Sequence, residues 1–169
     1  MPQTGSPRAA AATGRTTFTQ TSDRELVAAR TFDAPRALVF EACTRCEHLA
    51  RWYGPRAMTM ASCESDLRPG GRFRYVLRGP DGSEHGFRGE FLEVVVPERV
   101  VNTWEWEPMP GHGSVETATF EDAGDGRTTI TVTVRFATAE DFAGWHGSGA
   151  TAGMAESYDR LAELVAALR

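Results

Sequence analysis

The sequence lacks the features that would place the protein in a membrane or on a nucleic acid. No apolar run among its 169 residues approaches the ~20 residues that a transmembrane helix needs. The N-terminus has no apolar core of the kind that secretion signals carry. The formal net charge of −5 disfavours a polyanionic partner. We therefore expect a cytoplasmic protein that has neither a membrane nor a nucleic acid as its partner.

Cysteine is also scarce, with three residues, Cys43, Cys46 and Cys63. An odd number argues against a disulfide framework and favours a reducing compartment. In the stretch CTRCEH, His48 comes two residues after the second cysteine, whereas haem attachment needs a histidine directly after it. A thioredoxin-type pair opens a helix within a βαβ unit, but Cys43 falls near the end of a predicted helix. Zinc needs four ligands, and nothing in the spacing directs Cys63 toward the others. We predict structural thiols, no metal and no cofactor.

Motifs of common enzyme classes are absent too. The sequence has no G-x-S-x-G elbow and no H-E-x-x-H zinc helix. Its glycine-rich stretches RPGG and GPDG are typical of turns rather than of phosphate-binding loops. Whether the protein is an enzyme stays open at this point, and these absences lean against it.

The order of the predicted elements indicates one domain behind a tail. Residues 1–22 are small and polar and offer too little apolar surface to offset the entropy of ordering, so we predict a disordered tail and a domain over 23–169. A strand at 24–32 precedes two short helices that end near Thr44 and at Gly54–Pro55. From Met58 to Phe136 the apolar period is two, with turn residues between the runs.

The C-terminal stretch has a helical period instead. Met154, Tyr158, Leu161, Val165 and Leu168 follow one another at spacings of four, three, four and three, which places them on one helical face. Hairpin strands make an antiparallel sheet, and its apolar face is the only large surface that can bury this helix. We therefore predict an α+β fold in which about seven curved antiparallel strands, two short helices and a long C-terminal helix make a pocket plausible.

The order of motifs resembles a known superfamily. The stretches that carry the resemblance are RTFDAPRALVFEACT, LARWYGP, DLRPGGRFRYVLRGPDG, GEFLEVVVPERVVNTWEW, GRTTITVTVRF and GMAESYDRLAELV, which together span about Glu25 to Leu168. They resemble the helix-grip fold of the START-like, birch-pollen-allergen-like (SRPBCC) superfamily, in the bacterial branch related to the C-terminal domain of heat-shock ATPase activators. Met154 departs from this pattern, because many relatives have Trp there, and the cysteines are not part of it.

Alternation along the strands selects the candidate site residues. Tyr75 alternates with Arg74, Phe87 with Arg88, and Trp104 with Glu105, so these aromatic side chains share the face opposite the charges. His85 is in phase with Phe87 and is a weak candidate for a general acid or base. The predicted ligand-binding set is Trp52, Phe73, Tyr75, His85, Phe87, Asn102, Trp104, Trp106, Met154 and Tyr158.

The resemblance implies the fold more strongly than the function, because the superfamily hosts lipid carriers, cyclases, hydrolase-like enzymes and co-chaperone domains. Our first hypothesis is a protein that binds a small hydrophobic or aromatic molecule in a cavity between the sheet and the C-terminal helix. The alternatives are a cyclase- or hydrolase-like enzyme that acts on a ligand in that cavity, with His85 as its acid or base, and a chaperone-interaction domain. A homodimer is left open.

Overall fold

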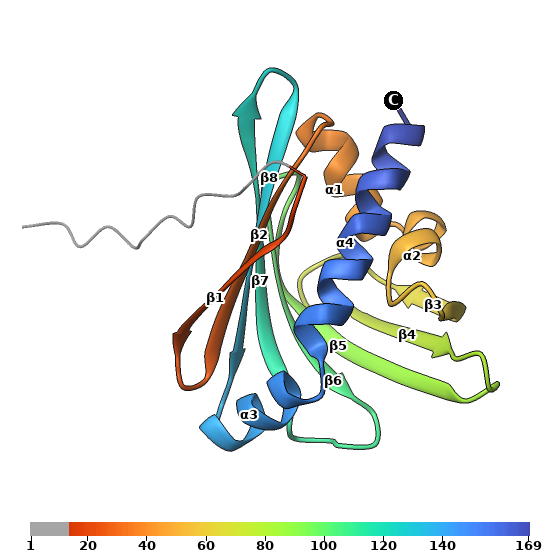
Figure 1. The fold of residues 1–169 in the computed structure, drawn as a ribbon, viewed down its shortest axis with the longest axis vertical. Coiled ribbons are helices and arrows are strands. Elements are labelled where there is room, and N and C mark those ends of the chain that lie inside the picture. The colour runs from red at the N-terminus through yellow and green to blue at the C-terminus, as the bar shows by residue number, and fades with distance from the viewer. Residues whose placement is uncertain (1–13) are drawn as a thin grey trace, which may run out of the picture.

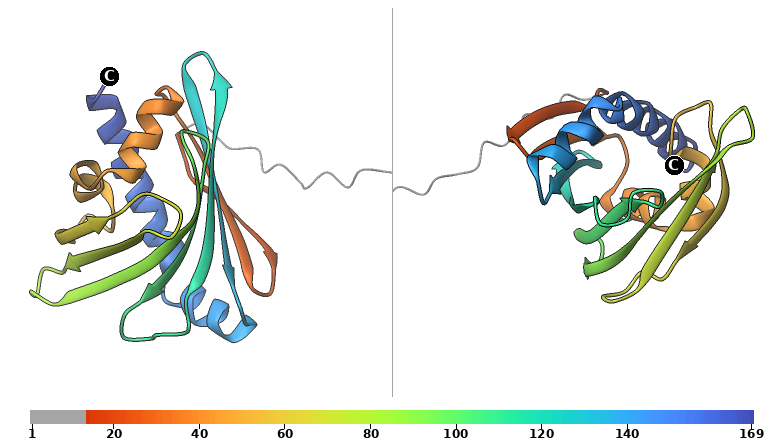
Figure 2. Two further views of the ribbon diagram at one scale, coloured as in Figure 1. Left: turned by 180° about the vertical axis from the view of Figure 1, so that it is seen from behind. Right: turned by 90° about the horizontal axis from the view of Figure 1, so that it is seen from below.

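A single antiparallel sheet of eight strands, in the order β1-β2-β8-β7-β6-β5-β4-β3, forms the frame of residues 14–169, which the computed structural model describes (Figure 1). The strands are β1 (Thr17–Ser22), β2 (Glu25–Phe32), β3 (Thr59–Ser65), β4 (Arg72–Arg78), β5 (Glu84–Val95), β6 (Arg99–Trp106), β7 (Ser114–Gly124) and β8 (Arg127–Phe136). The helices are α1 (Arg36–Thr44), α2 (Cys46–Trp52), α3 (Ala139–Gly147) and α4 (Ala150–Ala167). Seen from below, the sheet curls around the side on which α4 lies (Figure 2).

The predicted alternation fixes which face of the sheet is buried. In β8 the side chains of Thr128, Ile130, Val132, Val134 and Phe136 are buried, and the residues between them are more exposed. Successive side chains of a strand point to opposite faces, so this pattern gives one apolar inner face. The helices α1, α2 and α4 lie against that face (Figure 1). The α+β helix-grip class predicted from the sequence is confirmed.

Two boundaries differ from the sequence prediction. Residues 17–22 were placed in the tail, but they form β1, which pairs antiparallel with β2 from Thr17↔Ala29 to Ser22↔Glu25. Phe18 packs against the core from this edge strand, so that burial of its ring adds to the backbone pairing with β2. The remainder of the predicted tail, 1–13, lies outside the described residues. The second difference is α3, a helix that precedes α4 in addition to the two short helices and the C-terminal helix predicted from the sequence; Thr138 is its N-cap.

Helix α4 is held by polar contacts at the same time as it is buried. Leu161, Leu164 and Val165 enter the core, while Ser157 accepts a hydrogen bond from the Gly54 amide at 3.0 Å. The Arg160 guanidinium donates to the carbonyl oxygens of the segment that ends α2, at distances of 2.8–3.2 Å. These bonds satisfy carbonyl groups that a helix end leaves without partners. They fix α2 against α4. No helix within 14–169 is both long and apolar enough to cross a membrane.

We expect the Leu161→Ala variant to lose about 2–5 kcal/mol of unfolding free energy, because Leu161 is completely buried and its truncation leaves a cavity. Leu92, which is 49% exposed on β5, provides the matched control, and Leu92→Ala should change stability by no more than about 0.5 kcal/mol. Denaturant titration measures both. Equal losses in the two variants would contradict the position assigned to α4.

Candidate functional site

An internal cavity of about 140 Å³ lies between the inner face of the sheet and the helices α1, α2 and α4. Strands β4 to β8 form its floor, and Tyr158 of α4 closes it from the opposite side. Eight of the eighteen residues in its wall are aromatic, namely Trp52, Tyr53, Phe73, Tyr75, Phe91, Trp104, Phe120 and Tyr158. Such a mostly apolar enclosure with a few polar groups is the usual character of a small-molecule site.

The aromatic rings hold one another in place. Trp52 stacks on Tyr158 with ring centroids 6.1 Å apart, and its indole N–H donates to the Ala42 carbonyl at 2.8 Å. Tyr53 meets Tyr75 edge to face at 5.0 Å. Aromatic pairs prefer such offset and edge-to-face geometries, which add to the stabilisation from burial. Part of the cavity wall is therefore a connected set of aromatic rings from the end of α2, from β4 and from α4.

Polar groups enter the cavity from the centre of the sheet. In the antiparallel pair of β6 and β7, Asn102 lies directly opposite Glu116, and both side chains line the cavity. The Asn102 amide donates to the Thr103 carbonyl at 3.0 Å. The Tyr53 hydroxyl accepts a hydrogen bond from the Trp104 indole N–H at 3.2 Å. Asn102 and Tyr53 thus have internal partners.

Glu116 is the exception among these polar groups. Among residues 14–169, no side chain forms an ion pair with its carboxylate or donates a hydrogen bond to it. Burial disfavours the charged form and raises the pKa of this carboxyl to about 7. No arginine, lysine or histidine of the described part of the chain belongs to the cavity wall. The cavity therefore contains a carboxyl group whose charge changes near neutral pH and that is not compensated from within.

The structure brings together six of the ten sequence-predicted site residues. The six that line the cavity are Trp52, Phe73, Tyr75, Asn102, Trp104 and Tyr158. The other four, His85, Phe87, Trp106 and Met154, are not in its wall. All four follow the predicted inward phase, but phase selects a face of a strand or helix and not a position along it. They lie beyond the stretch over which α4 and the sheet enclose space.

His85 lies outside the cavity wall and therefore cannot act there as the predicted general acid or base. Its ring stacks on Trp106 at 6.4 Å, and its Nε2 lies 3.4 Å from the Ser83 hydroxyl in the turn between β4 and β5. The ring of Phe87 stacks on the ring of Trp104, with centroids 5.3 Å apart, so that Phe87 contacts a wall residue without lining the cavity itself. Met154 packs against the core near the start of α4. An acid–base pair of His85 with a cavity carboxylate is not formed.

Sequence reasoning missed Glu116 and Tyr53. The signal for Glu116 was present, because in VETATFED it is in phase with Ala118 and Phe120, which point inward. A charged residue on the apolar phase of a strand is uncommon, since burying a carboxylate is costly. Tyr53 follows the last residue of α2, where no strand or helix period constrains its direction.

The cysteines correct a further expectation. Cys46 of α2 and Cys63 of β3 form a disulfide with 17 residues of sequence separation, whereas the sequence predicted structural thiols and the odd cysteine count had argued against a disulfide framework. The curvature of the sheet brings β3 beside α2, which no local spacing reveals. Cys43 stays free in the cavity wall, where burial raises the pKa of its thiol. Across residues 14–169 no group of three or more potential metal-ligating side chains occurs.

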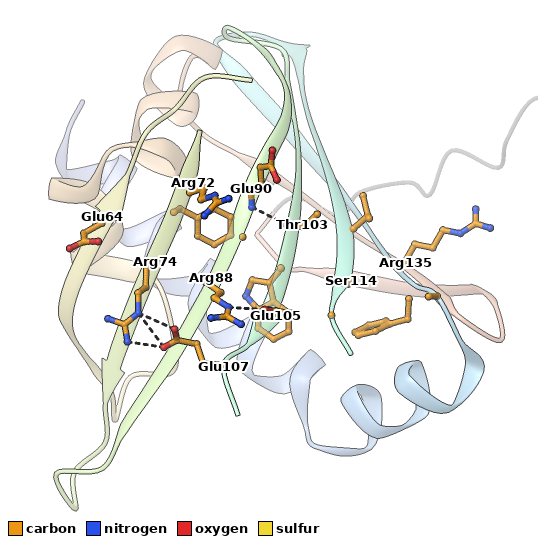
Figure 3. A pocket seen from close by; sticks show the side chains of 17 residues that line it. Glu64, Arg72, Arg74, Arg88, Glu90, Thr103, Glu105, Glu107, Ser114 and Arg135 are labelled. Atoms are coloured by element: carbon orange, nitrogen blue, oxygen red, sulfur yellow. Dashed lines mark hydrogen bonds and ion pairs between the residues drawn. The ribbon is translucent and has the colours of Figure 1, made fainter. Parts of the chain in front are cut away.

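A larger hollow of about 930 Å³ lies on the outer face of the sheet (Figure 3). Its charges are largely neutralised in place, because Arg74 pairs with Glu107 at 2.7 Å and Arg88 pairs with Glu105 at 2.7 Å. These pairs lower the pKa of both glutamates, which stay ionised at neutral pH. Solvated, self-compensated pairs offer little net attraction to a ligand. We therefore regard the internal cavity as the candidate site.

A curled antiparallel sheet closed by a long C-terminal helix over an aromatic cavity defines a protein of the helix-grip class. The profile of the family described as Activator of Hsp90 ATPase homolog 1-like protein matches residues 33–166, and the chain belongs to this family. No curated protein matches the chain.

Solved structures of bacterial proteins share the fold. One from Rhodobacter sphaeroides has a TM-score of 0.83 and 25% identity over 90% of this chain and 99% of its own. One from Nitrosomonas europaea has a TM-score of 0.78 and 25% identity over 86% and 96% of the two chains. The AHSA1 protein of Silicibacter pomeroyi, at 21% identity and a TM-score of 0.70 over 86% and 99%, is similar in fold.

The raised pKa of Glu116 predicts how stability depends on pH. The native carboxyl holds its proton up to about pH 7, while in the unfolded chain it has the ordinary glutamate pKa of 4.5 and loses the proton there. The native state therefore binds more protons in this interval, and the contribution of Glu116 to stability falls by about 3 kcal/mol as the pH rises through it. In Glu116→Gln this loss should be absent.

Denaturant titrations from pH 5 to pH 8 measure the difference between wild type and Glu116→Gln. The variant should gain on the wild type as the pH rises and be the more stable protein at pH 8. Glu90→Gln, on the exposed outer face of β5, should follow the wild type throughout. A difference between Glu116→Gln and wild type that does not change with pH would contradict the half-buried, uncompensated carboxyl.

Proposed function

We propose that the protein binds a small, mostly apolar molecule with a single ring in the cavity between the sheet and α4. The observation that carries this proposal is a space of about 140 Å³ with eight aromatic side chains in its wall. An apolar cavity of roughly 150 Å³ is known to accept benzene. A ring of this size would find π faces on several sides, at the offsets that aromatic groups prefer.

The family supports this proposal only in part, since its members share a fold and the function lies in the particular site. A feature of this chain that supports the proposal is the small residue at position 118 on the inner face of β7. Ala118 lies between Glu116 and Phe120 on the inner face of β7, and its small methyl side chain leaves space in the cavity above the strand. A longer aliphatic side chain at that position would occupy the space we assign to the ligand.

A second candidate is acid–base chemistry on the bound ring. One observation favours it, the pKa of about 7 at Glu116, because a general acid or base works best when its pKa is close to the working pH. The partner that the sequence nominated, His85, is not in the wall. Binding is the simpler proposal because it needs no second catalytic group.

The Ala118→Ile variant tests binding by filling the cavity. Benzyl alcohol should raise the melting temperature of the wild type by mass action and quench its fluorescence, because Trp52 and Trp104 form part of the wall. In Ala118→Ile we expect the affinity to fall at least tenfold. Overpacking will also cost about 1–3 kcal/mol of stability, which a scan without ligand measures separately.

Thr117→Ile is the matched control, because it adds a similar side chain to the neighbouring residue on the outer face of β7. It should retain wild-type affinity. If Ala118→Ile binds benzyl alcohol as tightly as Thr117→Ile does, the ligand occupies another place and the proposed site is wrong.

A further inference from the structure

The cavity wall has an imbalance of charge that points to the class of its ligand. Among residues 14–169, Glu116 is the only acidic residue in the wall, and no arginine, lysine or histidine of this range lines the wall to compensate it. The other titratable groups that line the cavity are the hydroxyls of Tyr53, Tyr75 and Tyr158 and the thiol of Cys43. Burial raises the pKa of each of these four groups, so that all of them are neutral across the physiological range.

These neutral groups come from α1, from the residue that follows α2, from β4 and from α4. The neighbouring strands β6 and β8 contribute Asn102, Trp104, Ile130 and Val132, which carry no charge. A half-buried carboxylate without a partner is unfavourable, and an arriving cation would supply the missing countercharge. An anionic ligand would instead place a second negative charge in the same low-dielectric space.

The aromatic wall favours a cation for an independent reason. The face of an aromatic ring carries partial negative charge, and an ammonium group within about 6 Å of a ring centroid is attracted to it, more strongly where water is excluded. Trp52, Tyr53, Tyr75 and Tyr158 form contiguous stacked or edge-to-face pairs in the wall. Rings together with one carboxylate are the groups that recognise organic ammonium ions.

We propose that the ligand of this cavity is a small organic amine, a single ring that carries a protonated primary amino group, bound through its ammonium N–H groups to the carboxylate of Glu116. This inference rests on the proposed function and specifies its ligand class. The ring lies among the aromatic side chains, and the ammonium group lies at the junction of β6 and β7, where Asn102 faces Glu116. The Asn102 side-chain carbonyl oxygen is a second acceptor for the ammonium group.

Isothermal titration of the full chain with two probes tests this assignment. Benzylamine carries the ammonium group, and benzyl alcohol is its neutral counterpart of similar size. At pH 8 we expect benzylamine to bind the wild type at least tenfold more tightly than benzyl alcohol does. The ammonium group stays protonated at this pH, as a lysine side chain does. Below the pKa of Glu116, about 7, the affinity for benzylamine should fall about tenfold per pH unit, since the carboxyl must release its proton to bind the cation.

The variant Glu116→Gln distinguishes binding in the cavity from the preference for an amine. It should lose the preference for benzylamine over benzyl alcohol and lose the pH dependence, whereas Glu90→Gln on the outer face should keep both. If the wild type binds benzyl alcohol but shows no preference for benzylamine, or if Glu116→Gln keeps that preference, the amine assignment is wrong and the cavity remains a binding site. If neither probe binds the wild type, the proposed function fails together with the amine assignment.

Discussion

The packing of α4 across the inner face of the curved sheet is the constraint on which the other features of the structure depend. Leu161, Leu164 and Val165 anchor the helix, and burying such side chains stabilises a fold by about 1.5–3 kcal/mol each. The Arg160 guanidinium ties the end of α2 to the same helix. The sheet can curl around α4 because its inner face is apolar from β2 to β4, so that helix and sheet share one core.

The same constraint explains why a cavity remains. A straight helix can contact a curved sheet closely along only part of its length, and beyond that part large side chains must bridge the gap. Trp52, Tyr75 and Tyr158 do so as pairs of rings, which leave space where their edges do not meet. The small side chain of Ala118 and the uncompensated carboxyl of Glu116 lie beneath this space. An apolar residue at 116 would cost less to bury, and its absence is the reason to assign the position a role in recognition.

The period of the sequence was sufficient to predict the sheet, the long helix and the face that each buries. It also placed Tyr75, Trp104 and Tyr158 on the correct faces. It failed for features that depend on the curvature of the sheet, which no local pattern encodes. His85 and Phe87 have the right phase but lie beyond the enclosed region, and Cys63 meets Cys46 only because the edge of the sheet turns toward α2.

Two further errors have local causes. The polar composition of residues 17–22 suggested disorder, because the backbone pairing with β2 that orders them leaves no trace in composition. Glu116 lies on the apolar phase of β7 with Ala118 and Phe120, and a charge on that phase is a stronger indication of a site than the aromatic side chains from which the site was predicted. The strand period alone places Glu116 on the inner face, whereas only the structure shows that its carboxylate lacks a partner among residues 14–169.

A crystal structure of the protein grown at pH 8 with benzylamine tests the central claim most directly. The account predicts a ring inside the cavity between β4 and α4, with its nitrogen within about 2.7–3.2 Å of a Glu116 carboxylate oxygen, the usual range of such a hydrogen bond. A cavity that is filled by protein side chains, or a ligand bound only on the outer face of the sheet, would contradict it.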